Sequence, residues 1–190
     1  MTGRTHDLIA FTGLLTATII YPPAHLTLGT AVAAFLANQV GGITPDIDQP
    51  TAPFWRNLPI GGLIGKIISK MLGGHRFITH SVLGLILFGF LAKLLLGFIH
   101  PIFPRINMEL VWWAYMIGMV SHLIIDTFSK EGVPWLLPIP IKFGIPPIRA
   151  WRITTDKFIE NWVLFPGLIF VNLVLIATNY EVLVGLLHKV

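Results

Sequence analysis

The sequence contains no cysteine among its 190 residues. Disulfide bonds are therefore excluded, and so are zinc sites built from thiolates. Any metal site in this chain must use nitrogen and oxygen ligands, which histidine, aspartate and glutamate supply. Cysteine usage also gives no information here on the redox compartment of the protein.

Charged residues are scarce as well, at 12% of the chain, whereas soluble domains carry about 25%. Hydrophobic residues make up 54%, and the mean hydropathy is +0.76. The apolar excess is spread over several segments, so we expect a single membrane-embedded domain over residues 1–190. The net charge of +4 comes from scattered basic residues, which argues against nucleic acid and favours membrane lipid as a partner.

Apolar segments predict an all-α fold, a polytopic membrane helix bundle of about five transmembrane helices. They cover residues 8–21, 26–43, 81–99, 110–127 and 158–179. The first segment is only about 21 Å long as a helix. We expect it to be tilted, thinly covered or extended through His6, and to be retained in the mature protein because no convincing cleavage site follows.

Three further features concern packing and connections. Residues 58–72 mix apolar side chains with Lys66 and Lys70, which predicts an amphipathic helix in the membrane interface. Residues 129–157 contain five prolines and predict an irregular, partly membrane-embedded functional loop. A small-residue stripe that favours close helix packing recurs every four positions at Gly29, Ala33, Ala37 and Gly41.

The candidate ligands converge if each of the five segments crosses the membrane once. They then share one membrane face: His6, Asp46, Asp48, His75, His80, His122, Asp126 and Glu160. Most basic residues lie at the same face, against Arg105 and Lys189 at the other, so the positive-inside tendency makes the site face cytoplasmic. We exclude His25, His100 and His188, because they fall on the other side or near the C-terminus.

The pair His122 and Asp126 has the four-residue spacing that stacks two side chains on one helix face. This spacing suits a shared metal ion. A carboxylate at the C-terminal end of a helix opposes the macrodipole, so Asp126 needs a metal or a nearby arginine. The alternative is a carboxylate at the headgroup boundary that pairs with Lys130.

Residues 73–81 place His75, Arg76 and His80 directly before the third apolar segment. A helix N-terminus favours neutral imidazoles, the form that binds metals. Arg76 is a candidate for bidentate contacts to phosphoryl oxygens, or else a side chain that snorkels to the headgroups. Thr79 is a candidate catalytic residue, although Thr79 or Ser81 equally suits a helix N-cap.

Asp46 and Asp48 lie two residues apart in a proline-stiffened loop. One can bridge two metals while the other ligates or acts as general base, or the pair forms a solvated turn. His6 and Glu160 are weak signals alone, and a helix dipole also explains Glu160. As a set, four His, three Asp and one Glu match a site for two or three divalent metals, zinc foremost and manganese as an alternative.

The motifs resemble the YdjM-like family of bacterial inner-membrane metal-dependent hydrolases. The resemblance rests on His6 and on four motifs, at residues 43–48, 74–81, 121–126 and 132–138. The order of ligand types is also similar, more loosely, to the zinc-dependent phospholipase C and P1 nuclease group, which are helical trinuclear zinc phosphodiesterases. The family resemblance implies a hydrolase of the inner membrane and leaves the substrate open, whereas the enzymes of the second group are soluble.

We therefore expect metal-activated hydroxide to hydrolyse a phosphoester, a small molecule or a lipid, at the cytoplasmic membrane face. Asp48, Arg76 and Thr79 are the candidate catalytic residues. A membrane metal transporter or metal sensor without hydrolytic activity is the alternative, because intramembrane ionisable residues also mark ion pathways. A third interpretation is a structural protein whose polar residues anchor headgroups. The oligomeric state stays open.

Overall fold

The computed structural model describes residues 1–56, 58–74, 76–139 and 141–187, and in this part of the chain the regular structure is helical. The only strand-like pairings within it are two isolated bridges, Ser129 with Ile153 and Val133 with Phe143. The helices are α1 (Gly3–Ile20), α2 (Leu28–Ile43), α3 (Pro53–Arg56), α4 (Gly61–Met71), α5 (Val82–Ile99), α6 (Met108–Thr127), α7 (Phe165–Thr178) and α8 (Tyr180–Leu187). The all-α prediction is confirmed.

Among the described residues, three helices are long and apolar enough to cross a membrane, by length and composition. They are Val82–Ile99, Met108–Thr127 and Glu160–Thr178, with mean hydropathies of 2.5, 1.4 and 1.9. Within the protein 44% of the second span is buried, against 11% and 6% of the other two. α6 is therefore the central helix, whereas α5 and α7 leave most of their apolar surface outside.

Helices α2 and α6 cross at very close range because a glycine of each helix faces the backbone of the other. A Cβ added at Gly41 would lie 2.1 Å from the Tyr115 carbonyl oxygen, and one at Gly118 would lie 2.1 Å from the Asn38 carbonyl oxygen. Asn38 is buried and donates to the Ala114 carbonyl at 3.1 Å across the same contact. The small-residue stripe predicted in α2 thus serves helix packing at Gly41.

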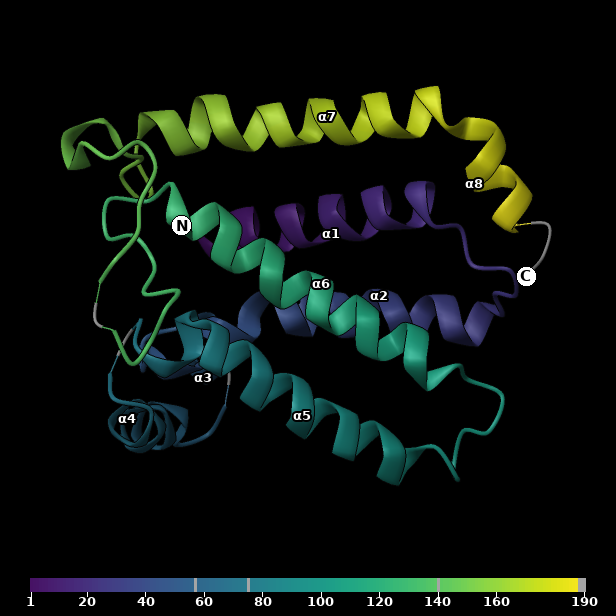
Figure 1. The fold of residues 1–190 in the computed structure, drawn as a ribbon, viewed down its shortest axis with the longest axis horizontal. Coiled ribbons are helices and arrows are strands. Elements are labelled where there is room, and N and C mark those ends of the chain that lie inside the picture. The colour runs from purple at the N-terminus through teal and green to yellow at the C-terminus, as the bar shows by residue number, and fades with distance from the viewer. Residues whose placement is uncertain (57, 75, 140, 188–190) are drawn as a thin grey trace.

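The helix ends that carry candidate ligands meet at one end of the bundle, which we call the site pole. α1, α5 and the last long helix begin there, while α2 and α6 end there, on the left of Figure 1. The alternating course expected from the sequence places these ends together. α1 and α2 pack beside α6 but are less apolar or shorter than the three candidate spans, with 18 and 16 residues.

One boundary differs from the prediction, and the last long helix has a local irregularity near its predicted beginning. α1 begins at Gly3, so His6 lies inside the helix instead of preceding it, and the expected extension of the first segment through His6 is present. The last long helix begins with a π-helical turn, Glu160–Leu164, and continues directly into α7. The chain then bends at Asn179 into α8.

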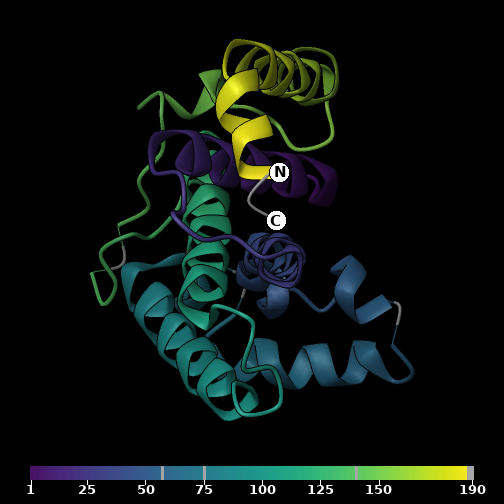
Figure 2. The same ribbon diagram turned by 90° about the vertical axis from the view of Figure 1, so that its right-hand side faces the viewer.

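The amphipathic segment expected at residues 58–72 is helical as α4. Its axis lies across the bundle, since α4 is viewed end-on in Figure 1 and from the side in Figure 2. The described part of the loop 129–157 is irregular, as predicted, and covers the site pole. Trp135 ties it to two helices, because its carbonyl accepts from Val82 N at 3.0 Å and its indole donates to Thr127 at 3.0 Å.

Candidate metal centre

His122 is held in the tautomer that binds metals. It lies in α6, and its Nδ1 is 2.6 Å from the Gly42 carbonyl oxygen at the end of α2. Because a carbonyl only accepts hydrogen bonds, Nδ1 must carry the proton, and the lone pair of the neutral ring is left on Nε2. A carbonyl partner of this kind fixes both ring orientation and tautomer at metal sites.

His80 is oriented by a relay of two hydrogen bonds. It ends the 3₁₀ turn Ile78–His80. The Thr79 hydroxyl donates to Asp48 Oδ2 in a short hydrogen bond, so its oxygen is left to accept from His80 Nδ1 at 2.9 Å. Nε2 of His80 is therefore the ring atom turned toward Asp46 and Asp126.

A first group of ligand atoms surrounds a common point between α2, α5 and α6. Asp46 Oδ1 lies 3.8 Å from Nε2 of both His80 and His122. Asp126 Oδ2 lies 3.6 Å from His80 Nε2 and 3.8 Å from His122 Nε2. The ligand atoms of Asp46, His80 and His122 all lie within 4.8 Å of one another. Ligands of a tetrahedral zinc are about 3.4 Å apart, so these three residues could hold an ion after a modest contraction.

A second group shares His122 with the first and adds His6 of α1 and Asp126 of α6. The rings of His6 and His122 stack with centroids 3.6 Å apart, and His6 Nε2 lies 3.5 Å from Asp126 Oδ1. Ligand atoms of these three residues lie within 4.8 Å of one another. Asp126 therefore turns Oδ1 toward His6 and Oδ2 toward His80 and His122.

Buried atoms without hydrogen bonds indicate that the cluster fits a cation. Within the described residues, both ring nitrogens of His6 and Nε2 of His122 are buried and have no hydrogen-bond partner. Leaving such groups unpaired costs about 1–3 kcal/mol each. A divalent ion accepts these lone pairs, and the set of imidazoles and carboxylates suits zinc or manganese.

The surroundings of His80 also favour a cation beside it. Burial lowers the pKa of the imidazole, but the carboxylates of Asp126, Asp48 and Asp46 outweigh this and raise the pKa above its usual value. Of these carboxylates, Asp46 is the accessible one, with a side chain 20% exposed, whereas Asp48 and Asp126 are fully buried. Solvent therefore reaches the cluster at Asp46.

Arg76 inserts a guanidinium between the cluster and the covering loop. Its Nη2 lies 2.5 Å from Asp126 Oδ2, and its Nη1 donates to Ser129 Oγ at 2.7 Å and to the Gly132 carbonyl at 3.3 Å. The backbone of Arg76 has a φ of 59°, a strained left-handed conformation that its N–H bond to Asp48 Oδ2 stabilises. Arg76 is thus the nearby arginine that the position of Asp126 required.

Glu160 is buried but lies outside both groups. Its Oε1 accepts hydrogen bonds from Thr2 and Thr5, and its Oε2 accepts one from Asp156 N at 2.7 Å. It ties the beginning of α1 to the beginning of the last long helix. Asp126 Oδ1 additionally accepts from the Met1 amino group at 2.8 Å. A ligand role for Glu160 stays a prediction.

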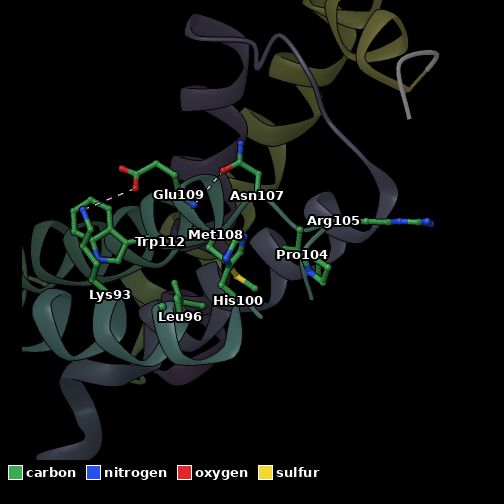
Figure 3. Close-up of a pocket in the computed structure, with 11 residues that line it drawn as sticks. Lys93, Leu96, His100, Pro104, Arg105, Asn107, Met108, Glu109 and Trp112 are labelled. Atoms are coloured by element: carbon green, nitrogen blue, oxygen red, sulfur yellow. Dashed lines mark hydrogen bonds and ion pairs between the residues drawn. The ribbon is translucent and has the colours of Figure 1, made fainter. Parts of the chain in front are cut away.

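The remaining histidines fall as follows. His75, a predicted ligand, lies outside the described residues, as does the excluded His188. His25 and His100 are exposed in the turns at the other end of the bundle, away from the cluster. His100 lines a cavity of about 590 Å³ between α5 and α6 together with Lys93, Glu109 and Trp112 (Figure 3). That cavity contains neither of the two ligand groups.

Two contacts of the centre have no signal in the sequence. The Gly42 carbonyl that orients His122 is a backbone group, and Ser129, which holds Arg76, is one of many hydroxyl residues. From the sequence alone, a serine that follows the C-terminal end of α6 indicates no more than a helix cap. The bond partners lie 80 and 53 residues apart along the chain, so packing alone brings them together.

The fold and the cluster define an all-α membrane protein with a buried histidine and aspartate site able to hold metal. The chain belongs to the YdjM inner membrane protein family, whose sequence profile matches residues 1–186. It is 29% identical over 164 residues to the uncharacterized protein YvsG of Bacillus subtilis, covering 86% of this chain and 88% of that protein. This family places the chain in the inner membrane, as predicted.

Two further relatives share a shorter region. The inner membrane proteins YdjM of Escherichia coli and of Shigella flexneri are each 31% identical over 106 residues, which is 55% of this chain. The chain spans about half the length of these two relatives, 48% in each case. No solved structure matches the chain.

Proposed function

We propose that the protein is a membrane-bound metal-dependent hydrolase that cleaves a phosphoester, including lipid phosphoesters, at the cytoplasmic membrane face. The observation that carries the proposal is that two groups of ligand atoms share His122, while Asp126 of the second group also faces His80 of the first. Paired cations of this kind occur in phosphatases and nucleases. A structural role needs no such convergence of unsatisfied imidazole nitrogens.

The proposal includes five membrane crossings. α1 and α2 extend for about 27 and 24 Å, and both lie alongside the central span α6. α2 turns large apolar side chains outward along its length, among them Leu28, Phe35 and Val40. Five crossings put the site pole at a single face, where the excess of basic residues favours the cytoplasm.

Five side chains would hold the ions. The first group would use Asp46, His80 and His122, and the second His6, His122 and Asp126. When bound, divalent ions would lower the pKa of a water molecule and polarise the phosphoryl oxygens. We favour two zinc ions on these groups, with a third ion or manganese as alternatives.

The protein's own residues would orient the reacting groups. Asp48 and Thr79 hold the His80 ring through the relay described above. Arg76 fixes Asp126, and its buried Nε, 3.6 Å from the exposed Glu131 carboxylate, is the atom we assign to a phosphoryl oxygen. Asp46 borders the solvent side and is our candidate for accepting the proton of the attacking water.

The test is phosphodiesterase turnover by detergent-purified protein loaded with zinc or manganese. Bis(p-nitrophenyl) phosphate and phospholipid in mixed micelles are the substrates. We expect turnover by the wild type and by His25→Ala, whose side chain is exposed far from the site, and loss of turnover in His122→Ala. Equal turnover in all three proteins, or none in the metal-loaded wild type, would contradict the hydrolase.

Metal transport or sensing is the second candidate, favoured by one observation. His6, His122 and Asp126 lie within helices α1 and α6, and ionisable residues inside membrane helices often mark ion paths. Proteoliposomes separate the two functions. Uptake of zinc without turnover of phosphoester supports transport, whereas turnover without uptake supports the hydrolase.

A further inference from the structure

Helix α4 packs directly against Trp55 through two glycines, and this contact leaves no room for a methyl group. A Cβ added at Gly65 would lie 2.9 Å from the Trp55 ring, and one at Gly61 would lie 2.0 Å from the Trp55 carbonyl oxygen. Both glycines are buried, and Trp55 is only 4% exposed. The position of α4 is therefore coupled tightly to that of Trp55.

Trp55 in turn holds the turn that carries two acids of the metal centre. Its Nε1 donates to the Ile47 carbonyl at 3.0 Å, and Ile47 lies between Asp46 and Asp48 in the 3₁₀ turn Thr44–Asp48. Asp46 faces His80 and His122, while Asp48 accepts from Thr79. A continuous set of contacts therefore joins α4 to the ligand atoms of the first group.

The opposite face of α4 is apolar and has no cover among the described residues. Leu63, Ile67 and Met71 follow one another at four-residue spacing and are 62%, 54% and 76% exposed. Lys66 and Lys70 are exposed beside this stripe. α4 lies across the bundle at the site pole, as Figures 1 and 2 show together.

An exposed apolar stripe with lysines beside it fits a membrane surface that contains anionic lipid headgroups. A helix that lies flat at the interface buries its apolar stripe at the acyl boundary and places its lysines among the headgroups. Anionic lipid attracts lysines that lie near the membrane surface. The three candidate membrane spans indicate a membrane, into which the apolar stripe of α4 can insert.

We propose that α4 docks on anionic phospholipid and, through Trp55, holds the Asp46–Asp48 turn in its metal-binding geometry. Anionic lipid then raises the metal affinity of the site, and by reciprocity bound metal strengthens the lipid contact by the same factor. This inference rests on the metal site of the proposed function, and it adds a lipid-dependent control of that site.

The experiment compares zinc affinity of the full chain in two kinds of nanodisc, by competition with a chelator. One contains phosphatidylcholine alone, and the other contains phosphatidylcholine with phosphatidylglycerol. We expect at least about fivefold tighter zinc binding with phosphatidylglycerol, the lower end of typical coupling between two sites. Added salt should reduce this difference, because it screens the lysines.

Four variants locate the coupling. Lys66→Gln with Lys70→Gln should abolish the lipid effect and leave affinity in phosphatidylcholine unchanged, whereas Lys130→Gln with Lys142→Gln, two exposed loop lysines, should keep it. Gly65→Ala should weaken the effect because its methyl group meets Trp55, while Gly62→Ala, which has open space, should not.

A fifth variant tests the link at Trp55. Trp55→Phe keeps an aromatic ring under α4 but loses the bond to Ile47, so lipid should still bind while zinc affinity no longer responds to it. Equal zinc affinity of the wild type in both nanodiscs overturns the inference, and so does a full lipid effect in the double lysine variant of α4. If zinc binds in neither kind of nanodisc, the result contradicts the metal site itself.

Discussion

The Arg76 Nη2 atom lies 2.5 Å from Asp126 Oδ2, so a buried guanidinium neutralises a carboxylate at the C-terminal end of α6. The helix dipole disfavours an anion there, and removing the cation from a buried pair costs about 3–5 kcal/mol. We expect Arg76→Gln to lower the thermal stability of the metal-free protein strongly. Zinc should restore part of the loss, because it supplies another cation to Asp126.

Thermal unfolding in detergent, with and without zinc, measures this effect. The matched control is Arg149→Gln, which removes an exposed arginine from the same face of the protein. If both substitutions shift the midpoint equally, the Arg76 pair has no special structural role.

The relay of Asp48, Thr79 and His80 makes a prediction about metal affinity. Thr79→Val keeps the shape of the side chain but removes the hydroxyl that orients His80. Loss of such outer partners typically weakens metal binding 10- to 100-fold. We expect a zinc affinity lower by about that factor, measured by chelator competition. Thr79→Ser retains the hydroxyl and should restore the affinity, and a failure of this rescue would argue against the relay.

The two ligand groups predict different losses from two histidine variants. His122 belongs to both groups, whereas His6 belongs to one. His122→Ala should therefore remove most bound metal, while His6→Ala should leave the ion of the first group. Elemental analysis of protein dialysed against zinc gives the stoichiometry. Equal metal content in the two variants would mean that the groups do not act as separate sites.

Acid should weaken metal binding through His80. The neighbouring carboxylates raise the pKa of this imidazole, so in the metal-free site its proton is retained to higher pH than on an ordinary histidine. Metal must displace that proton, and zinc affinity should fall as pH decreases through the raised pKa. Proton release on zinc binding, followed by calorimetry in buffers of different ionisation enthalpy, measures this directly. Binding without release of protons near neutral pH would contradict it.

The close crossing of α2 and α6 predicts a stability difference between two glycine variants. Gly118→Ala places a methyl group 2.1 Å from the Asn38 carbonyl oxygen, so the helices must separate, at a cost of about 1–3 kcal/mol. Gly97→Ala adds the same methyl group in open space on α5. We expect a lower unfolding midpoint only for Gly118→Ala. The same midpoint for both would indicate a looser packing than the structure has.

The length and spacing of the apolar segments predicted much of the fold. The spacing of His122 and Asp126 predicted a pair on one helix face, and alternation of segments placed Asp46 and His80 near it, as the structure does. The apolar pattern began the first helix at Leu8, with an extension through His6 as one option, and the structure extends it further, to Gly3. Hydropathy alone does not reveal a helix turn that is buried by tertiary contacts.

The sequence predicted which residues gather in the cluster better than it predicted what each of them does there. Asp48 and Glu160 were both predicted as ligands together with Asp46, although Glu160 was a weak signal alone. In the structure Asp48 accepts hydrogen bonds from Thr79 and Arg76, and Glu160 accepts one from Thr5 near the beginning of α1. Which oxygen meets which donor depends on packing between distant segments, and no local pattern encodes it. The ligand and catalytic assignments of the individual residues stay predictions until metal is measured.

Elemental analysis of the protein purified in detergent and dialysed against a trace of zinc is the most direct test of the metal centre. We expect at least one ion per chain in the wild type and in His25→Ala, and a large loss in His122→Ala. Wild-type protein without bound zinc or manganese, or the same metal content in His122→Ala, would contradict a metal site at this cluster.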